Sequence, residues 1–386
     1  MSRDVPAACS EAGAILARGA GHGDANGDAG RPVLPSAWPQ LGNPGLEGSY
    51  RVRCEDFRVE ELPGWTPDGN GEHLLLEVEK TGSNTAFVAQ ALAREAGIDV
   101  RDVSWCGAKD RHAVTRQWFS LRDPSAACTL APGAAGKGWS VLAAARHRRK
   151  LRRGDHAGNR FRIRIELDEA PPPELLPWVH ERLATGVPNY FGPQRFGRSG
   201  SNLHAAQLWV EGGVQGGRLP RRGAARGFLL SAARALLFNE VLAARLLAGS
   251  ACSVLEGEAL LDGEPTGPLW GRGRTLATGV AGAVEAAALA PWQAWCARLE
   301  QVGLNQQRRA LWLRPRSADA TLAGRSLTLS FTLPAGAFAT AVLAGIGRFR
   351  DQAGRDQAGQ QSDARDAPMA PESHSASMCH DDGADG

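Results

Sequence analysis

Residues 103–121 have the sequence VSWCGAKDRHAVTRQWFSL, which places one carboxylate among cations between two apolar runs. Residues 103–106 and 114–121 predict two short buried strands, and Gly107 supplies the turn after the first. Asp110 is therefore expected in a tight loop where strands end. The neighbouring Lys109 and Arg111 favour its charged form, which suits a nucleophile or base and suits a structural ion pair equally well.

Outward from this loop, the chain alternates between sheet and helix patterns. A helix is predicted to begin after Asn84, a good N-cap, and to end at Gly97. Residues 159–167 alternate strictly between apolar and charged side chains, which predicts a half-buried strand with Asn159 and Phe161 on the same face. The apolar positions expected in the core are Phe87, Val88, Ala91 and Leu92 of the helix and Phe161, Ile163, Ile165 and Leu167 of the strand.

A mainly helical region interrupts the sheet pattern. The run Ala170-Pro171-Pro172-Pro173 and a short amphipathic helix lead to a plausible boundary near Thr185. Two apolar helical patterns follow, one after Ser231 and one around residues 292–302. Alternation returns at residues 326–331, so elements of one sheet are expected to flank a helical insertion.

Three motifs, in this order along the chain, resemble the tRNA pseudouridine synthase D (TruD) family. They are GAKDRHAVT at residues 107–115, NYFGPQRFG at residues 189–197 and LPAGAFAT at residues 333–340. Shorter matches are EDFRV at 55–59, ARHRRKL at 145–151 and GNRF at 158–161. The similarity extends from about residue 49 to about residue 349.

The resemblance implies an α+β fold, in which a pseudouridine synthase catalytic domain with a mainly antiparallel mixed sheet and flanking helices is interrupted by a mainly helical inserted TRUD domain. The expected organisation is a disordered leader at 1–48, the catalytic domain at 49–184 and 313–350, the inserted domain at 185–312, and a disordered tail at 351–386. Composition favours disorder at both ends, because the leader is rich in Ala, Gly and Pro without a sustained period and the tail has no aromatic residue.

The family activity implied is the isomerisation of uridine to pseudouridine at position 13 of tRNA. The reaction breaks the bond from C1′ to N1 and joins C5 to C1′ without exchanging electrons, so one carboxylate can serve it without a cofactor. Resemblance assigns that carboxylate to Asp110, either attacking C1′ or abstracting a sugar proton. A paired or stacked uridine must first be flipped out, and an extruded base is commonly held between aromatic or apolar faces.

Resemblance also assigns the substrate-binding positions. Phe57, Phe161 and Phe338 match the family's aromatic positions, although each could be an ordinary core phenylalanine. Asn159 can bind the uracil edge through its amide, or can be a turn asparagine beside Gly158. Lys109 and Arg51 are the candidate cations beside Asp110.

Basic residues are candidates for contacts with the RNA backbone, although a basic run is also typical of a solvated surface. The candidates are Arg146, Arg148, Arg149, Lys150 and Arg195. A non-catalytic RNA-binding protein is the alternative function. A methyltransferase has little support, because no glycine-rich strand-turn-helix fingerprint is present outside the leader.

The chain has 386 residues, of which 43% are hydrophobic and 22% charged, and a formal net charge of +3, so it can form a sizeable core in two domains. Its seven cysteines include no C-x-x-C pair, and no metal site is predicted. No segment after the first residues reaches the length needed to span a bilayer. A cytoplasmic monomer that binds tRNA, with no membrane or obligate protein partner, is expected.

Overall fold

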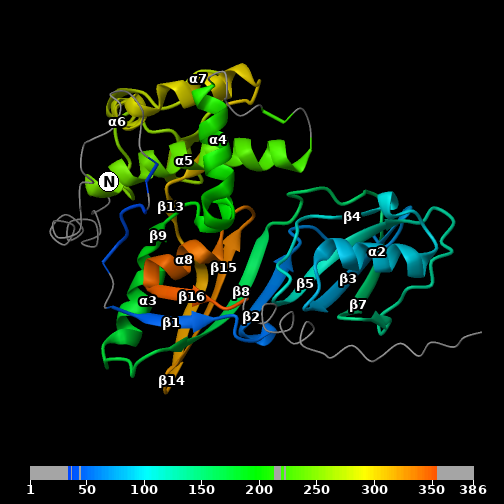
Figure 1. Ribbon diagram of the computed structural model, residues 1–386. Coiled ribbons are helices and arrows are strands. Elements are labelled where there is room, and N and C mark those ends of the chain that lie inside the picture. The colour runs from blue at the N-terminus through cyan, green and yellow to red at the C-terminus, as the bar shows by residue number, and fades with distance from the viewer. Residues whose placement is uncertain (1–33, 36, 43–44, 213–218, 221–222, 354–386) are drawn as a thin grey trace, which may run out of the picture.

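The computed structural model describes residues 34–35, 37–42, 45–212, 219–220 and 223–353. In these ranges an eleven-stranded sheet forms the lower part of the molecule, and a helical unit lies above the half of the sheet that contains β14 and β15 (Figure 1). This helical unit, which comprises the described residues between 187 and 313, is called the insert.

The sheet is mixed and mainly antiparallel, as predicted. Its main order is β14-β15-β8-β2-β5-β3-β7-β6, with β1 paired to β8 and β16, and β4 paired to β5. The parallel pairs are β2 with β5 and β1 with β16. The strands are β1 Glu47–Tyr50, β2 Phe57–Leu62, β3 His73–Thr81, β4 Val103–Trp105, β5 Val114–Arg122, β6 Ala135–Gly136, β7 Trp139–His147, β8 Gly158–Leu167, β14 Arg316–Ala323, β15 Ser326–Pro334 and β16 Arg348–Asp351.

Two hydrophobic cores divide the sheet at the β2–β5 pair. Helix α2 packs on β3, β4 and β5, whereas α3 and α8 cover β8 and β15. The helices are α2 Thr85–Ala96, α3 Leu175–Thr185 and α8 Ala339–Ile346, with the short helices η2 Cys54–Asp56 and η3 Val100–Asp102. The sheet therefore has two halves that meet at the β2–β5 pair. Residues at this boundary contact both halves.

Local sequence explains most of these elements. In α2, Asn84 Oδ1 accepts a hydrogen bond from the backbone N–H of Phe87 at 2.7 Å, and Gly97 ends the helix at a φ of 66°. The alternation in β8 is confirmed, because Ile163 and Ile165 are fully buried. The prediction that Phe87 is buried is wrong. Its side chain is 43% exposed, because α2 turns the faces of Val88 and Leu92 to the sheet.

The insert has its own core around the long helix α5. Its elements are β9 Val187–Pro188, η4 Pro193–Phe196, η5 Arg198–Gly200, α4 Ser201–Glu211, α5 Ala224–Leu247, β10 Leu260–Leu261, β11 Glu264–Leu269, α6 Gly279–Leu289, η6 Ala290–Trp292, α7 Gln293–Gln301, β12 Gln307–Ala310 and β13 Trp312–Leu313. Strands β10, β11 and β12 form a small sheet, and β9 pairs with β13 where the chain enters and leaves the insert.

Helix α5 corrects one prediction from the sequence. Ala224–Leu247 is long and apolar enough to cross a membrane by length and composition alone. However, 67% of its most apolar window is buried inside the protein, where Leu236, Leu237 and Val241 lie in the core of the insert. A core helix and a membrane helix pass the same composition test.

The two segments predicted to be disordered, 1–48 and 351–386, include residues that belong to the folded protein. Trp38 stacks on Phe196 and donates from Nε1 to Glu240 Oε1 at 2.8 Å, and Leu41 is buried in the core of the insert. At the other end, β16 continues through Asp351. Residues 1–33, 36, 43–44 and 354–386, which make up the rest of the two predicted segments, lie outside the described residues.

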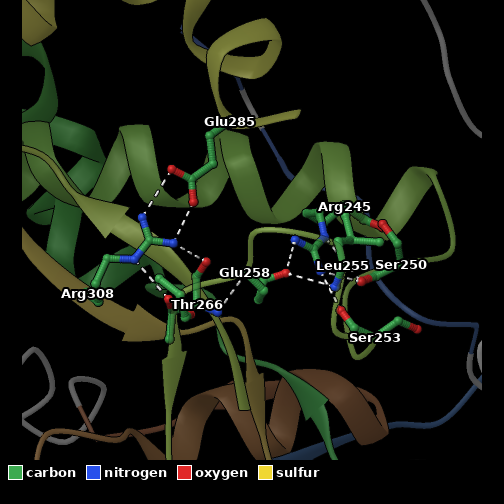
Figure 2. Close-up of polar contacts among 9 residues, drawn as sticks. Arg245, Ser250, Ser253, Leu255, Glu258, Thr266, Glu285 and Arg308 are labelled. Atoms are coloured by element: carbon green, nitrogen blue, oxygen red, sulfur yellow. Dashed lines mark hydrogen bonds and ion pairs between the residues drawn. The ribbon is translucent and has the colours of Figure 1, made fainter. Parts of the chain in front are cut away.

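A buried polar network holds the insert together (Figure 2). Arg245 and Glu258 form an ion pair at 2.7 Å with both side chains 1% exposed, and the Arg245 guanidinium also donates to the carbonyls of Ser250 and Ser253. Arg308 pairs with Glu285 through both carboxylate oxygens. These charges are tolerated in a low-dielectric core because their hydrogen bonds are satisfied.

We expect Glu258→Ala to lower the free energy of unfolding by about 3–5 kcal/mol, because it leaves the Arg245 charge buried without its partner. Urea unfolding measures the loss. The matched control is Glu60→Ala, which removes the partner of Arg160 from a pair whose side chains are 39% and 58% exposed. It should cost about 1 kcal/mol or less, and equal losses for the two variants would contradict the assignment.

Candidate active site

The loop 106–113, between β4 and β5, carries Asp110 back across the sheet. Gln117 on β5 donates from Nε2 to the carbonyl of Gly107 at 3.1 Å, and the backbone N–H of Lys109 donates to Thr85 Oγ1 at 2.9 Å. Gln117 and Thr85 are themselves bonded at 3.0 Å and are buried. The loop thus rests on polar side chains of β5 and α2, which fix its backbone.

Lys80 is the third anchor of the loop, and sequence analysis missed it. Its ammonium donates to the carbonyls of Ser83, Lys109 and Asp110 at 2.8, 3.4 and 2.7 Å, and the residue is 1% exposed. Burial lowers its pKa from 10.5 to about 8, while the charge of Asp110 acts in the opposite direction. A signal was present in the sequence, since Lys80 has the parity of Leu74, Leu76 and Val78 and so belongs to the inner face of β3.

Arg51 is the cation that contacts the Asp110 carboxylate. Arg51 Nη2 lies 2.8 Å from Asp110 Oδ2, and the guanidinium carbon lies 4.0 Å from the centre of the Phe57 ring. The Arg51 side chain is 9% exposed, whereas that of Asp110 is 39% exposed. The carboxylate is therefore open to solvent on one side and held by a buried cation on the other.

Lys109, the other candidate cation, is bound elsewhere. Its ammonium pairs with Glu61 Oε2 at 2.6 Å, with the two side chains 6% and 0% exposed. Glu61 Oε1 also accepts from the backbone N–H of Trp118 at 3.2 Å. Lys109 thus ties the loop to β2 and β5 instead of contacting the Asp110 carboxylate.

Asn159 lies at the start of β8, opposite Glu61 on β2 and Leu333 on β15. Its Nδ2 is 3.5 Å from His156 Nε2, and burial and the charge of Lys109 lower the pKa of His156. Asn159 Oδ1 is buried and has no hydrogen-bond partner in the described part of the chain. An unpaired buried carbonyl is costly, so this oxygen is a natural acceptor for a ligand.

The three predicted aromatic residues have different surroundings. Phe57 and Phe161 are 1% and 7% exposed and belong to the core beneath α3 and α8, with ring centres 6.2 Å apart. Phe338, at the N-cap of α8, is half-buried and contacts Phe191 across the junction with the insert at 6.2 Å. Phe57 and Phe161 thus match the core alternative in their packing, and Phe57 also supports Arg51.

Two arginines surround Phe338 at this junction. The guanidinium carbons of Arg195 and Arg309 lie 5.4 and 5.6 Å from the Phe338 ring centre. Arg309 also donates to Asn189 Oδ1 at 2.5 Å and to the carbonyl of Gly336 at 3.1 Å. Burial and the charge of Arg195 lower the pKa of Arg309 to about 10. Arg309, which sequence analysis missed, therefore joins the insert to the loop that carries Phe338.

The basic run at the end of β7 divides into paired and exposed side chains. Arg146 forms an ion pair with the buried Asp123 at 2.6 Å, so its charge is already used within the protein. Arg148 contacts Asn70, and Lys150 donates to the carbonyl of Arg101. An open hollow of about 290 Å³ is lined by Arg148, Arg149, Lys150, Arg152, Glu72, His73 and Asp155.

Within the described ranges, no three His, Cys, Asp or Glu side chains gather in a way that could hold a metal ion. Cys54, Cys106, Cys128 and Cys296 are free thiols, and burial raises the pKa of Cys106 and Cys296 to about 12. These two thiols stay protonated at neutral pH and are therefore poor nucleophiles.

Comparison with known proteins agrees with the motifs. The family model described as tRNA pseudouridine synthase D (TruD) matches residues 40–215. A tRNA pseudouridine synthase D of Cellvibrio japonicus is 45% identical over 309 residues, which cover 77% of this chain and 89% of the relative. This chain belongs to the TruD family.

Other members and a solved structure extend the comparison. The tRNA pseudouridine synthase D of Xanthomonas euvesicatoria is 42% identical over 359 residues, covering 83% of this chain and 96% of that TruD protein. A crystal structure of a candidate TruD protein from Methanosarcina mazei has a TM-score of 0.58 at 20% identity and covers 82% of this chain and 96% of that one. At that identity, the structural match shows the shared fold alone.

Titration of Lys80 gives a testable consequence for stability. Its pKa is about 8 in the folded protein and 10.5 for an ordinary lysine, so between these values the unfolded chain binds one more proton. Its contribution to the free energy of unfolding should therefore rise with pH by about 1.4 kcal/mol per unit across this window. Comparing urea unfolding of the parent with Lys80→Met from pH 7 to pH 10 isolates the effect. Parallel curves for the two proteins would disprove it.

Proposed function

We propose that this protein isomerises uridine to pseudouridine at position 13 of tRNA, with Asp110 as the nucleophile and the target base flipped out of the RNA. The observation that carries the proposal is the pairing of a solvent-open Asp110 with the buried Arg51, on the loop that bears the family's GAKDRHAVT motif. The names of the TruD relatives support the substrate class and the reaction.

The geometry suits a carboxylate that must stay charged and reach a sugar. Arg51 bonds Asp110 through Oδ2, which leaves Oδ1 for the ribose. Attack of that oxygen on C1′ displaces uracil at N1; rotation of the base and bonding of C5 to C1′ then release the carboxylate. The proton on C5 leaves at the end and a proton is gained at N1, so no oxidant or reductant is needed.

The base would be held by groups on both halves of the sheet. The unpaired Oδ1 of Asn159 can accept the N3–H of uracil, and the half-buried ring of Phe338 offers an apolar face for the extruded base. Phe57 and Phe161 would support this surface from the core. In the proposal the protein acts in the cytoplasm as a monomer, without a cofactor or a protein partner.

The RNA backbone is assigned to three exposed cations and to the half-buried Arg195. Arg148, Arg149 and Lys150 line one open hollow, and Arg195 lies beside Phe338. Arg146 is withdrawn from the predicted set, because its guanidinium bonds the carboxylate and the carbonyl of Asp123. A phosphate would have to compete with that carboxylate.

We expect the parent protein to release tritium from C5-labelled uridine in a tRNA transcript without any added cofactor, and Asp110→Asn to release none. The amide has the size of the carboxylate but lacks the anionic oxygen that attacks C1′. Affinity for the transcript should be nearly unchanged, as measured by filter binding. A transcript with cytidine at position 13 should also release no tritium from the parent.

Two other outcomes would decide against this assignment. Tight binding without turnover by the parent would favour the alternative, a non-catalytic RNA-binding protein. Equal tritium release by the parent and Asp110→Asn would show that another group performs the chemistry.

We further expect Arg149→Gln to weaken tRNA binding and to reduce the slope of log affinity against log salt by about 0.7–0.9, the value of one lost phosphate contact. The matched control is Arg146→Gln, whose charge is paired with Asp123. It should leave the slope unchanged and lower the thermal midpoint instead. Equal slopes for the parent and Arg149→Gln would remove Arg149 from the RNA interface.

A further inference from the structure

The C-terminal strand β16 reaches the candidate active site. It pairs in parallel with β1 so that Asp351 is opposite Tyr50, and the backbone N–H of Gln352 donates to the carbonyl of Tyr50 at 3.1 Å. Arg51 follows directly in the chain. Asp351 thus lies beside the cation that binds Asp110, although the two aspartates are 241 positions apart in the sequence.

Asp351 and Asp110 share the Arg51 guanidinium. Asp351 Oδ2 is 3.3 Å from Arg51 Nη1, while Asp110 Oδ2 is 2.8 Å from Arg51 Nη2. Tyr50 donates its hydroxyl to Asp351 Oδ2 at 3.2 Å. Burial, with the charge of Asp351, raises the pKa of Tyr50, so the phenol remains a donor at neutral pH. Asp351 Oδ1 also accepts from the backbone N–H of Ala353 at 3.0 Å, so three donors fix the carboxylate.

This sharing restricts how Arg51 can bind Asp110. A guanidinium favours a bidentate pair with a carboxylate, in which two nitrogens bind both oxygens. Here the second terminal nitrogen is directed to Asp351, and the stack on Phe57 at 4.0 Å holds the guanidinium plane. Asp110 is left with one bonded oxygen.

The backbone of Arg51 has an unusual conformation. Its φ is 58°, in the left-handed region that a residue with a side chain adopts at a cost. Such a conformation persists when its surroundings impose it. Two sets of contacts constrain Arg51. The β1–β16 ladder ends at the preceding residue, and the side chain of Arg51 forms ion pairs with Asp110 and Asp351.

We propose that Asp351 is a positioning residue for the reaction: by holding Arg51 Nη1 it limits the guanidinium to Oδ2 of Asp110 and keeps Oδ1 free to react. The inference rests on the proposed function of Asp110. Without Asp351, Arg51 can turn both terminal nitrogens to Asp110, and a carboxylate bound at both oxygens is a weaker nucleophile.

The test is steady-state turnover of the full-length chain on the tRNA transcript. Asp351→Ala should lower kcat about tenfold with KM unchanged, because Arg51 Nη1 is then free to bond Oδ1 of Asp110, and that charge-assisted bond must be broken before the oxygen can attack. Asp351→Asn keeps an oxygen that can accept from Arg51 and Tyr50, so it should recover most of kcat. A role limited to fastening β16 would not give this rescue.

The matched control is Asp168→Ala. Asp168 Oδ1 pairs with Arg350 Nη2 at 2.6 Å, so this variant also removes an ion pair from β16, at the adjacent residue and away from Arg51. It should leave kcat unchanged. Thermal midpoints of both alanine variants measure any general loosening of the strand.

Equal kcat for Asp351→Ala and Asp168→Ala, or a change confined to KM, would overturn the positioning role. Asp110→Asn, assayed in parallel, separates this result from a failure of the proposed function. If Asp110→Asn is inactive while Asp351→Ala keeps full kcat, the role of Asp351 alone is wrong. If Asp110→Asn turns over like the parent, the assignment of Asp110 is wrong as well.

Discussion

The ion pair between Arg51 and Asp110 is the contact on which the site depends. Arg51 follows β1 and rests on Phe57 of β2, whereas Asp110 belongs to the loop between β4 and β5. The pair therefore spans the joint between the two halves of the sheet, where β2 and β5 run parallel. A shift of one half against the other would change the distance between guanidinium and carboxylate before it changed either core.

Three buried cations surround one loop, and each is satisfied differently. Lys80 donates to three carbonyl oxygens, Lys109 has a buried carboxylate, and Arg51 divides its donors between two half-exposed carboxylates. Removing charge from water is costly, and in each case the hydrogen bonds or ion pairs offset that cost. Here they fix the backbone of residues 109 and 110 and leave the Asp110 carboxylate facing solvent.

Local sequence patterns were sufficient to predict the elements that are determined by neighbouring residues. Asn84 and Gly97 bound α2, and the strict alternation after Asn159 gives β8. The candidate site residue Asp110 was predicted from the family motif, and Arg51 was one of two candidate cations beside it. Asp351 and Arg309 could not be found in this way, because their roles depend on pairing between strands far apart in the chain. Asp351 also lies in a polar segment whose composition favoured disorder.

The two-stranded ladder of β9 and β13 has a consequence for how the insert can move. Two chain connections between insert and sheet pass through this ladder, with Trp312 opposite Pro188 and Leu313 opposite Val187. A third segment joins the two parts, because Trp38 and Leu41 pack in the insert ahead of β1 in the chain. Arg309 bonds Asn189 and the carbonyl of Gly336 beside this ladder, so a displacement of the insert relative to the sheet must strain or break the contacts around Phe338.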